Sequence, residues 1–428
     1  MTNRKLLLQS FQAALAAADP LKIVPQHLPA PPKGRTLVVG AGKAAASMAR
    51  AVEDHWPTDK PLEGLVITRY GHSLSPENAI GKKIRVIEAG HPVPDESGEQ
   101  AAREIFDAVK SLGENDLLLA LISGGGSSLM SLPVVGVGMT DLKSVTKDLL
   151  NCGATIQEIN TVRKHLSLIQ GGQLAAASKA PVCALLISDV TGDEPTFIAS
   201  GPCAPDPTTY ADAIDVLARF KVSAPTSIQN YLAKGARGDI AETPKPGDKI
   251  FARVENKVIA TAQLSLQAAA DFFQAQKITP VILGDSVTGE ARDVAKVYAA
   301  LAKQIRHHQS PFKPPVALIS GGETTVTMRG NGRGGRNTEY LLSLAIELNG
   351  MENVFALACD TDGIDGSEPN AGALLMPDSL ARAKAKKLQS KQLLTNNDGY
   401  GFFSALDDVI VTGPTCTNVN DFRVILIL

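Results

Sequence analysis

The sequence is short of aromatic residues, paired cysteines and net charge. Aromatic side chains make up 4% of the 428 residues, and the formal net charge is only −2. This balance argues against nucleic acid as a partner, because nucleic-acid-binding proteins carry a marked basic excess. The cysteines form no C-x-x-C pair, which argues against a disulfide framework and a zinc site; they are Cys152, Cys183, Cys203, Cys359 and Cys416.

Long apolar runs are also missing. No stretch approaches the roughly twenty uninterrupted apolar residues that a membrane span requires. Residues 1–20 have the apolar spacing of an amphipathic helix, and Gln9 and Gln12 interrupt the apolar region that a signal peptide would need. We therefore expect a cytoplasmic globular protein without a membrane partner. The sequence leaves a homodimer open.

The sequence does contain many short apolar runs separated by helical stretches such as 99–112 and 262–276. The runs lack polar alternation, as strands buried on both faces of a parallel sheet do; they lie at 35–40, 64–69, 84–90, 116–123, 181–188, 257–261, 279–284, 315–320, 353–360 and 407–413. We predict an α/β protein of two domains with mostly parallel sheets flanked by helices, the N-terminal domain being Rossmann-like. The glycine- and proline-rich segment 234–250 separates the expected domains, 1–240 and 250–428.

Two apolar runs end in similar glycine-rich turns, SGGGSS after 116–122 and SGGETT after 315–319. Ligands of open α/β sheets bind outside the carboxyl ends of strands, where glycines expose backbone N–H groups to anions. Either turn alone is explained by a tight connection, but two of them favour an anion-binding cleft. The candidate binding residues are Ser123, Gly124, Gly125, Gly126, Ser127, Gly321, Gly322, Glu323 and Thr324.

The first predicted strand runs into GAGKAA, where three kinds of site compete. Gly40, Gly42 and Ala45 satisfy the relaxed dinucleotide pattern G-x-G-x-x-A. The next strand ends in Arg69, however, where a dinucleotide site usually has an acidic residue for the ribose hydroxyl. NAD binding is therefore disfavoured, although the 2'-phosphate of NADPH would tolerate arginine at this position. A Walker A pattern is not matched. Lys43 then stands at a strand-to-helix turn, where it can neutralise an anion or serve as a surface lysine.

Carboxylates and histidines follow other strands. Asp189 and Asp362 each lie just after an apolar run. Carboxylates in that position can bind Mg²⁺, which is held by one or two carboxylates together with substrate phosphates. Alternatively, these aspartates stabilise the turns in which they lie. Asp365 is assigned to capping and turns. His91, in AGHPVPD, either binds substrate or ties its loop, whereas His165 is assigned a structural role.

Long motifs in both halves resemble the glycerate 2-kinase family. The N-terminal motifs are GAGKAA, HPVPDESG, SGGGSSL, RKHLS and SDVTGDEPTFIASGP; SGGETTVTMRGNGRGGRN, TDGIDG and TGPTCTNVNDF resemble its C-terminal MOFRL domain. Some members are labelled hydroxypyruvate reductase and belong to tartrate-utilisation operons. The resemblance implies ATP-dependent phosphorylation of D-glycerate at the 2-hydroxyl, giving 2-phosphoglycerate and ADP. NAD(P)H-dependent reduction of hydroxypyruvate is the alternative.

The resemblance also implies roles for individual residues and an active site in the cleft between the two domains. Lys43 and Arg336 match catalytic or substrate-binding positions, and Asp189 is our third catalytic candidate. Arg336 is expected to hold a carboxylate or phosphoryl group in a bidentate contact, with Arg333 as the other candidate. Asp189 and Asp362 are the candidate magnesium ligands. The sequence departs from the family pattern at Gln170, Gln173, Thr338 and Cys416, where the family favours glycine at the last position.

Overall fold

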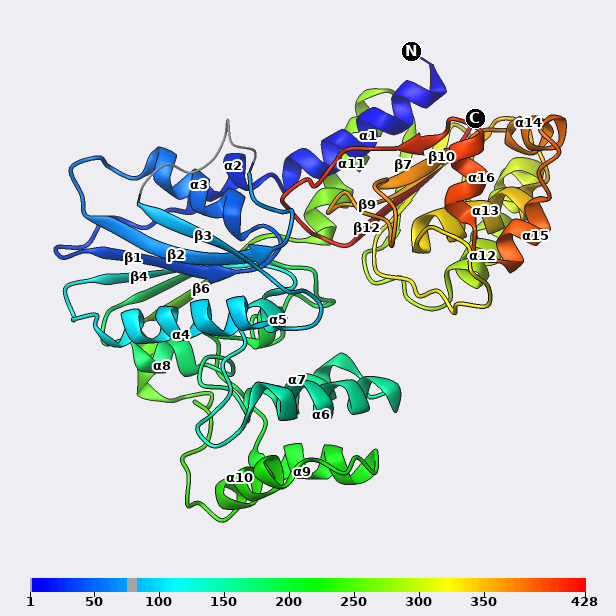
Figure 1. The fold of residues 1–428 in the computed structure, drawn as a ribbon. Helices are drawn as coiled ribbons and strands as arrows, with labels where there is room; N and C mark the ends of the chain where they lie inside the picture. The colour runs from blue at the N-terminus through cyan, green and yellow to red at the C-terminus, as the bar shows by residue number, and fades with distance from the viewer. Residues whose placement is uncertain (1, 75–82) are drawn as a thin grey trace. The chain divides into compact units, whose positions relative to one another are not determined.

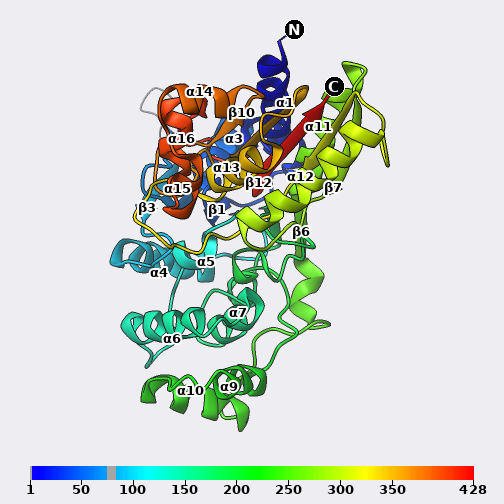
Figure 2. The same cartoon turned by 90° about the vertical axis from the view of Figure 1, so that its right-hand side faces the viewer.

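The computed structural model describes residues 2–74 and 83–428, which divide into two compact units. One unit comprises Pro20–Ile259; the other joins the residues up to Asp19 to Ala260–Leu428. Each unit contains one six-stranded sheet with helices on its faces (Figures 1 and 2). The predicted α/β class with a Rossmann-like N-terminal domain is confirmed. Within the described ranges, no helix has both the length and the apolar character needed to cross a bilayer.

The sheet of the first unit has the order β3-β2-β1-β4-β5-β6, and every pair with a recorded register, from β3 to β5, is parallel. Its strands are β1 Thr36–Ala41, β2 Leu62–Arg69, β3 Ile84–Ala89, β4 Leu117–Ile122, β5 Val182–Ile187 and β6 Val254–Ala260. The central strands β1, β4 and β5 are buried along their whole length, as their unbroken apolar runs predict.

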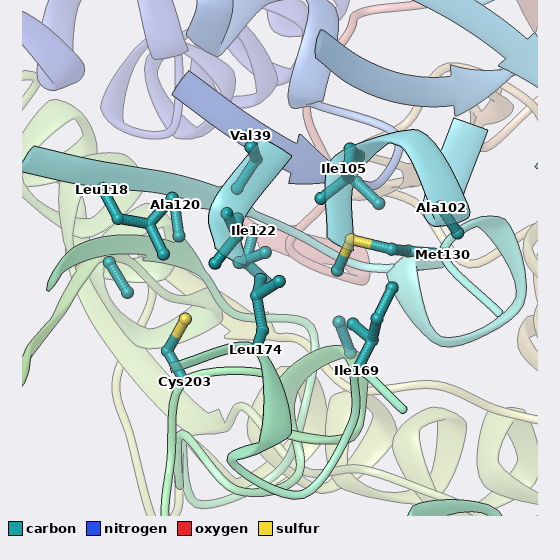
Figure 3. Close-up of a cluster of buried hydrophobic side chains, with 14 of the residues drawn as sticks. Val39, Ala102, Ile105, Leu118, Ala120, Ile122, Met130, Ile169, Leu174 and Cys203 are labelled. Carbon is teal, nitrogen blue, oxygen red and sulfur yellow. The ribbon is translucent and has the colours of Figure 1, made fainter. Parts of the chain in front are cut away.

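Helices cover both faces of this sheet (Figure 1). The α-helices and 3₁₀ helices (η) around this sheet are α2 Pro20–Ile23, η1 Val24–His27, α3 Ala45–His55, α4 Glu96–Lys110, α5 Gly126–Leu129, α8 Gln173–Ala177, η3 Ile198–Ser200 and η4 Lys249–Arg253. Figure 3 shows Ile122 of β4, Ile105 of α4 and Leu174 of α8 in the core on one face. Four further helices pack on one another around a second core; they are α6 Met139–Asn151, α7 Ile156–Lys164, α9 Tyr210–Arg219 and α10 Thr226–Ala236.

The sheet of the second unit is mixed, with the order β11-β10-β9-β12-β8-β7. Its strands are β7 Thr279–Gly284, β8 Val316–Ser320, β9 Val354–Asp360, β10 Gly372–Leu375, β11 Val409–Ile410 and β12 Asp421–Ile427. Only β7 and β8 pair in parallel, so the prediction of a mostly parallel sheet is wrong here. The reason is that β12 lies between β8 and β9 and runs opposite to both, while β10 follows β9 after the loop 361–371 and pairs with it antiparallel.

The helices of the second unit form two layers. Helices α1 Asn3–Ala17 and α11 Ala262–Ala275 pack on one face, and α12 Ala291–His308 and α13 Arg336–Leu348 contribute to the core on the other. The remaining helices are α14 Ser379–Ala385, α15 Ser390–Thr395 and α16 Gly399–Ala405.

The expected domain boundaries need correction at both ends. Helix α1 belongs to the second unit, because its apolar residues Leu7 and Phe11 are buried in the core that covers that sheet. The segment 234–250 is not the boundary either. It precedes β6, which still pairs with the first sheet, and the change of unit falls at Ile259 and Ala260.

Candidate active site

The first sheet reverses its strand order between β1 and β4. From β1 the chain proceeds outward through β2 and β3, and then returns to the other side of β1 with β4 and β5. Such a switch point creates a crevice outside the carboxyl ends of the two central strands. Because Ala41 pairs with Ile122, the turn that begins at Gly42 and the turn that begins at Ser123 start side by side.

Two hydrogen bonds join these turns. The backbone N–H of Lys43 donates to the carbonyl oxygen of Gly124 over 2.9 Å, and the N–H of Ala44 donates to Ser123 Oγ over 3.0 Å. Gly42 has a φ of +138°, and a Cβ there would lie 2.1 Å from Ser123 Oγ. The close approach of the Ser123 turn therefore requires glycine at position 42. The sequence-predicted Lys43, Ser123 and Gly124 are brought together.

Two more loops reach the SGGGSS turn. The His91 ring lies against Gly125, where an added Cβ would be 3.0 Å from His91 Nε2. Ser127 Oγ lies 2.9 Å from Ser200 Oγ. The predicted His91, Gly125 and Ser127 therefore lie together at one turn, and Ser200 lies beside it.

Ser200 was not selected from the sequence, although it lies in the FIASGP motif. It and its neighbour Ala199 have left-handed backbone conformations, with φ of +59° and +49°. A Cβ at Gly126 would come within 2.7 Å of Ala199 Cβ, so the glycine turn and this strained segment are packed in direct contact. Left-handed non-glycine residues are uncommon and cluster at functional sites. The strained backbone marks Ser200 as a candidate site residue, but backbone dihedral angles are not visible in the sequence.

A buried ion pair lies behind this segment. Lys164 Nζ donates to Thr196 Oγ1 over 2.8 Å and lies 3.4 Å from Asp206 Oδ1; both charged side chains are almost fully buried. Burial raises the pKa of Asp206, but the charge of Lys164 and the hydrogen bonds from Thr208 outweigh it and hold that pKa below its ordinary value. His165 is buried beside the pair, with Nδ1 2.8 Å from the Thr161 carbonyl, as its structural assignment predicts.

Asp189 follows β5, the neighbour of β4, and is half-buried at the carboxyl edge of the sheet. Its catalytic and metal-binding roles stay predictions. Gln170, one of the departures from the family pattern, donates from Nε2 to the Ser127 carbonyl over 2.8 Å and so supports the SGGGSS turn.

In the second unit, the turn after β8 is held by its own glycines and by an arginine. Gly322 has a φ of +96°, and a Cβ there would lie 2.3 Å from the backbone nitrogen of Val287. Arg423 Nη1 donates to the Gly321 carbonyl over 3.0 Å, and its Nη2 donates to Thr324 Oγ1 over 3.2 Å. The predicted residues Gly321 to Thr324 therefore form one fixed turn.

Arg336, the first residue of α13, donates to three carboxylates. Its Nε lies 2.9 Å from the Asp421 carboxylate, Nη1 lies 2.7 Å from Glu323, and Nη2 lies 2.7 Å from Asp360. Burial would lower the pKa of this guanidinium, but the three carboxylates raise it above its ordinary value. Arg336 is therefore permanently charged. Asp421, which the sequence analysis missed, also accepts from Arg423 and from Asn337 Nδ2.

A cavity of about 260 Å³ opens beside Arg336. Its walls come from the loop after β8, the start of α13 and two further loops; they are Thr324, Val326, Met328, Gly334, Gly335, Arg336, Glu339, Gly366 and Asn397. Arg333 is not part of this wall: it pairs with Glu368 at 3.5 Å and lies over the Tyr400 ring. Glu339 pairs with Arg292. Of the two arginines considered, Arg336 is the one that faces the cavity.

The TDGIDG turn contains two buried carboxylates with different surroundings. Asp365 accepts from the backbone N–H groups of Asn337 and Thr338, each over 2.9 Å, and thereby caps the start of α13 as predicted. Asp362 is buried, and its Oδ1 accepts from the Ile364 N–H over 2.9 Å. Residues 2–74 and 83–428 contain no group of three or more His, Cys, Asp or Glu side chains that could hold a metal ion. Mg²⁺ needs only one or two carboxylates when phosphates complete its shell, so the predicted ligands fit its chemistry.

Cys416, the departure from glycine, has a φ of +56° and is buried. This left-handed backbone is the conformation that glycine adopts without steric cost, which explains why glycine suits the position.

Two family models match the chain. The model described as "Domain of unknown function (DUF4147)" matches residues 6–233, and the MOFRL family model matches residues 316–421. The chain is 48% identical over 430 residues to an Agrobacterium vitis protein named "Putative hydroxypyruvate reductase", covering 100% of this chain and 95% of that protein. It is 38% identical to the D-glycerate 2-kinase of Thermotoga maritima, covering 99% of this chain and 98% of that enzyme.

A solved structure is similar as well. The crystal structure of glycerate kinase from Thermotoga maritima superposes with a TM-score of 0.88 at 38% identity and covers 99% of both chains.

Proposed function

This chain belongs to the glycerate kinase family that joins these two domains, and from that premise we propose that it transfers the γ-phosphoryl group of ATP to the 2-hydroxyl of D-glycerate. The observation that carries the proposal is the pair of joined turns at the switch point, where Lys43 stands beside SGGGSS. ATP and glycerate are both anions, and this is where an open α/β sheet binds anions.

The N-terminal unit supplies groups suited to phosphate oxygens. The glycines of SGGGSS let a phosphate approach the backbone, and the Lys43 ammonium delivers a positive charge at the mouth of the turn. His91 and Ser200 border the same turn, so they offer further hydrogen bonds to a bound anion. The hydrogen bonds that join the turns fix these groups before substrate arrives, and preorganised charge is the main requirement of phosphoryl transfer.

The C-terminal unit supplies a second cation. Arg336 is held by Asp360 and Asp421 and lines the cavity, and its Nη1 donates to the exposed Glu323. A planar guanidinium in that position can bind the glycerate carboxylate or the moving phosphoryl group in a bidentate contact.

In the proposed reaction, the 2-hydroxyl oxygen of glycerate forms a bond to the γ-phosphorus while the bond from that phosphorus to the β,γ-bridging oxygen breaks, which releases ADP. The hydroxyl proton passes to a carboxylate, for which Asp189 and Asp362 are our candidates. Lys43 is assigned to charge on the phosphoryl oxygens, and Arg336 to the glycerate carboxylate or the phosphoryl group. Mg²⁺ bound with ATP, held by Asp189 or Asp362, would neutralise the β- and γ-phosphates. The interdomain cleft, the cytoplasmic location and the homodimer stay predictions.

The reductase alternative loses much of its sequence support once the glycines are explained. A Cβ at Gly40 would lie 2.0 Å from the Leu121 carbonyl oxygen, and one at Gly42 would lie 2.1 Å from Ser123 Oγ. Both glycines are therefore required by the neighbouring strand β4 and its turn. The pattern G-x-G-x-x-A then needs no dinucleotide to account for it.

One assay separates the two activities. Purified protein is incubated with D-glycerate, ATP and Mg²⁺ and monitored for ADP, and in parallel with hydroxypyruvate and NADPH and monitored for NADPH oxidation. We expect ADP to form only when glycerate is present and NADPH to remain. NADPH oxidation without glycerate-dependent ADP would establish the reductase instead.

A further inference from the structure

The three carboxylates around Arg336 differ sharply in exposure. The side chains of Asp360 and Asp421 are 5% and 0% exposed, whereas that of Glu323 is 57% exposed. Asp360 ends β9 and Asp421 begins β12, and the two residues pair in the sheet, so the backbone that carries both aspartates is fixed. Glu323 is a turn residue, and an exposed ion pair contributes little to stability.

The turn that carries Glu323 does not depend on this ion pair. The Gly321 N–H donates to the Gly284 carbonyl over 2.8 Å, and Arg423 holds Gly321 and Thr324 from the other side. The Glu323 side chain can therefore swing into solvent while the backbone of the turn stays in place. Arg336 would then keep its two buried partners.

The charges favour such a movement when an anion binds. Arg336 and Arg423 carry two positive charges, and Asp360, Asp421 and Glu323 carry three negative ones, so the group has a net charge of −1. A singly charged anion that binds Arg336 with Glu323 in place would change the net charge from −1 to −2 in a partly buried site, where repulsion is poorly screened. A singly charged group, such as the glycerate carboxylate, that replaces Glu323 leaves the net charge of the group unchanged, and a phosphoryl group adds less negative charge than it would with Glu323 in place.

We propose that Glu323 is an exchangeable counter-ion, whose carboxylate leaves Arg336 Nη1 when an anionic group of the substrate binds there. The proposal rests on the proposed function for the identity of that substrate. The incoming group is the glycerate carboxylate or the transferred phosphoryl group, since both are acceptors that fit a guanidinium. Between turnovers, Glu323 thus neutralises Arg336 and lowers the affinity of Arg336 for anions.

The test measures anion binding without turnover. D-glycerate and inorganic phosphate are titrated separately, by calorimetry at fixed ionic strength, into wild type, Glu323→Gln and a control, Glu352→Gln. Glu352 is exposed near the start of β9, at the opposite end of that strand from Asp360, and its substitution removes the same charge. Loss of an exposed competing ion pair predicts about fivefold tighter binding of at least one anion by Glu323→Gln and no gain by Glu352→Gln.

The outcomes divide cleanly. Tighter glycerate binding identifies the displacing group as the substrate carboxylate, and tighter phosphate binding identifies the phosphoryl group. Unchanged or weaker binding of both anions by Glu323→Gln contradicts the proposal, and weaker binding would show that Glu323 itself contacts the ligand. The proposed function is tested separately by glycerate-dependent ADP formation in the wild type. If no ADP forms in that assay while Glu323→Gln binds phosphate more tightly, the counter-ion role of Glu323 is supported and the proposed kinase activity is contradicted.

Discussion

The backbone N–H of Lys43 donates to the carbonyl oxygen of Gly124 over 2.9 Å, so the turns after β1 and β4 are joined through main-chain atoms. The Lys43 side chain takes no part in that bond. Its chemistry can therefore be altered while the joint between the turns remains.

Lys43→Ala is expected to lose activity and keep its fold. If the ammonium neutralises phosphoryl charge, kcat should fall by about a hundredfold or more, as when one charge-stabilising donor is removed. Steady-state kinetics and a thermal melt measure the two effects. Lys33→Ala, at an exposed lysine before β1, is the matched control and should behave as wild type. Normal turnover by a folded Lys43→Ala would remove Lys43 from the site.

Gly42→Ala tests whether glycine is required by the protein itself. The new Cβ would lie 2.1 Å from Ser123 Oγ and 2.6 Å from its carbonyl oxygen, at a φ of +138°. Overpacking and backbone strain together should lower the free energy of unfolding by roughly 3 kcal/mol. Gly113→Ala, where the nearest atom recorded is 3.7 Å away, should change it by less than about 0.5 kcal/mol. Equal stability of the two variants in urea would show that the close approach is not a constraint.

The sequence predicted the strands well because buried strands are continuous apolar runs. Each of the ten predicted runs contains a strand, but β10 and β12 were missed. Strand β12 begins with Asp421 and contains Arg423. These two charged residues interrupt the apolar pattern in the sequence, and only the fold shows that they form an ion pair with each other. The placement of α1 depends on a sheet face more than two hundred residues away in the chain, and no local pattern reports which core an amphipathic helix will join.

The candidate site was predicted only in part, because a sequence shows local patterns and not the contacts that form on folding. Lys43 and SGGGSS were selected because glycine-rich turns at strand ends have a direct physical meaning, and His91 because it lies in the loop between a strand and a proline turn. Ser200 and Asp421 were not, because their importance arises from contacts: the first with Ser127, the second with Arg336. Such pairs exist only once the chain has folded.

Arg336→Lys is expected to impair glycerate turnover strongly. An ammonium cannot reproduce the guanidinium fork that donates to Asp421 and Asp360 while it offers a bidentate contact to a substrate anion. We expect kcat/KM for glycerate to fall about a hundredfold or more, with ADP affinity nearly intact by calorimetry. Arg333→Lys, at a 60% exposed side chain, is the control and should be nearly silent. A folded Arg336→Lys with near-normal turnover would redirect the search to Arg333.

Asp206→Asn should destabilise the protein and flatten its response to acid. Removal of the carboxylate leaves Lys164 buried without its ionic partner, which costs about 3–5 kcal/mol near neutral pH. Because the pKa of Asp206 is lowered in the fold, its contribution is present above the unfolded pKa of about 4 and is lost as pH falls through the folded value.

Urea unfolding from pH 7 downward measures both effects of the Asp206 substitution. Wild-type stability should fall more steeply below about pH 5 than that of Asp206→Asn. The double variant Lys164→Met with Asp206→Asn should recover part of the loss, because it no longer buries an unpaired charge. Parallel acid profiles for wild type and Asp206→Asn would mean that Asp206 does not titrate differently in the two states.

The central claim is the transfer of a phosphoryl group to the 2-hydroxyl of glycerate, and ³¹P NMR of the reaction mixture tests it most directly. Purified wild-type protein is incubated with D-glycerate, ATP and Mg²⁺, and the spectrum is compared with authentic 2-phosphoglycerate and 3-phosphoglycerate. We predict that the 2-phosphoglycerate signal grows in step with ADP. A 3-phosphoglycerate signal, or no phosphoglycerate while the same preparation oxidises NADPH with hydroxypyruvate, would contradict it.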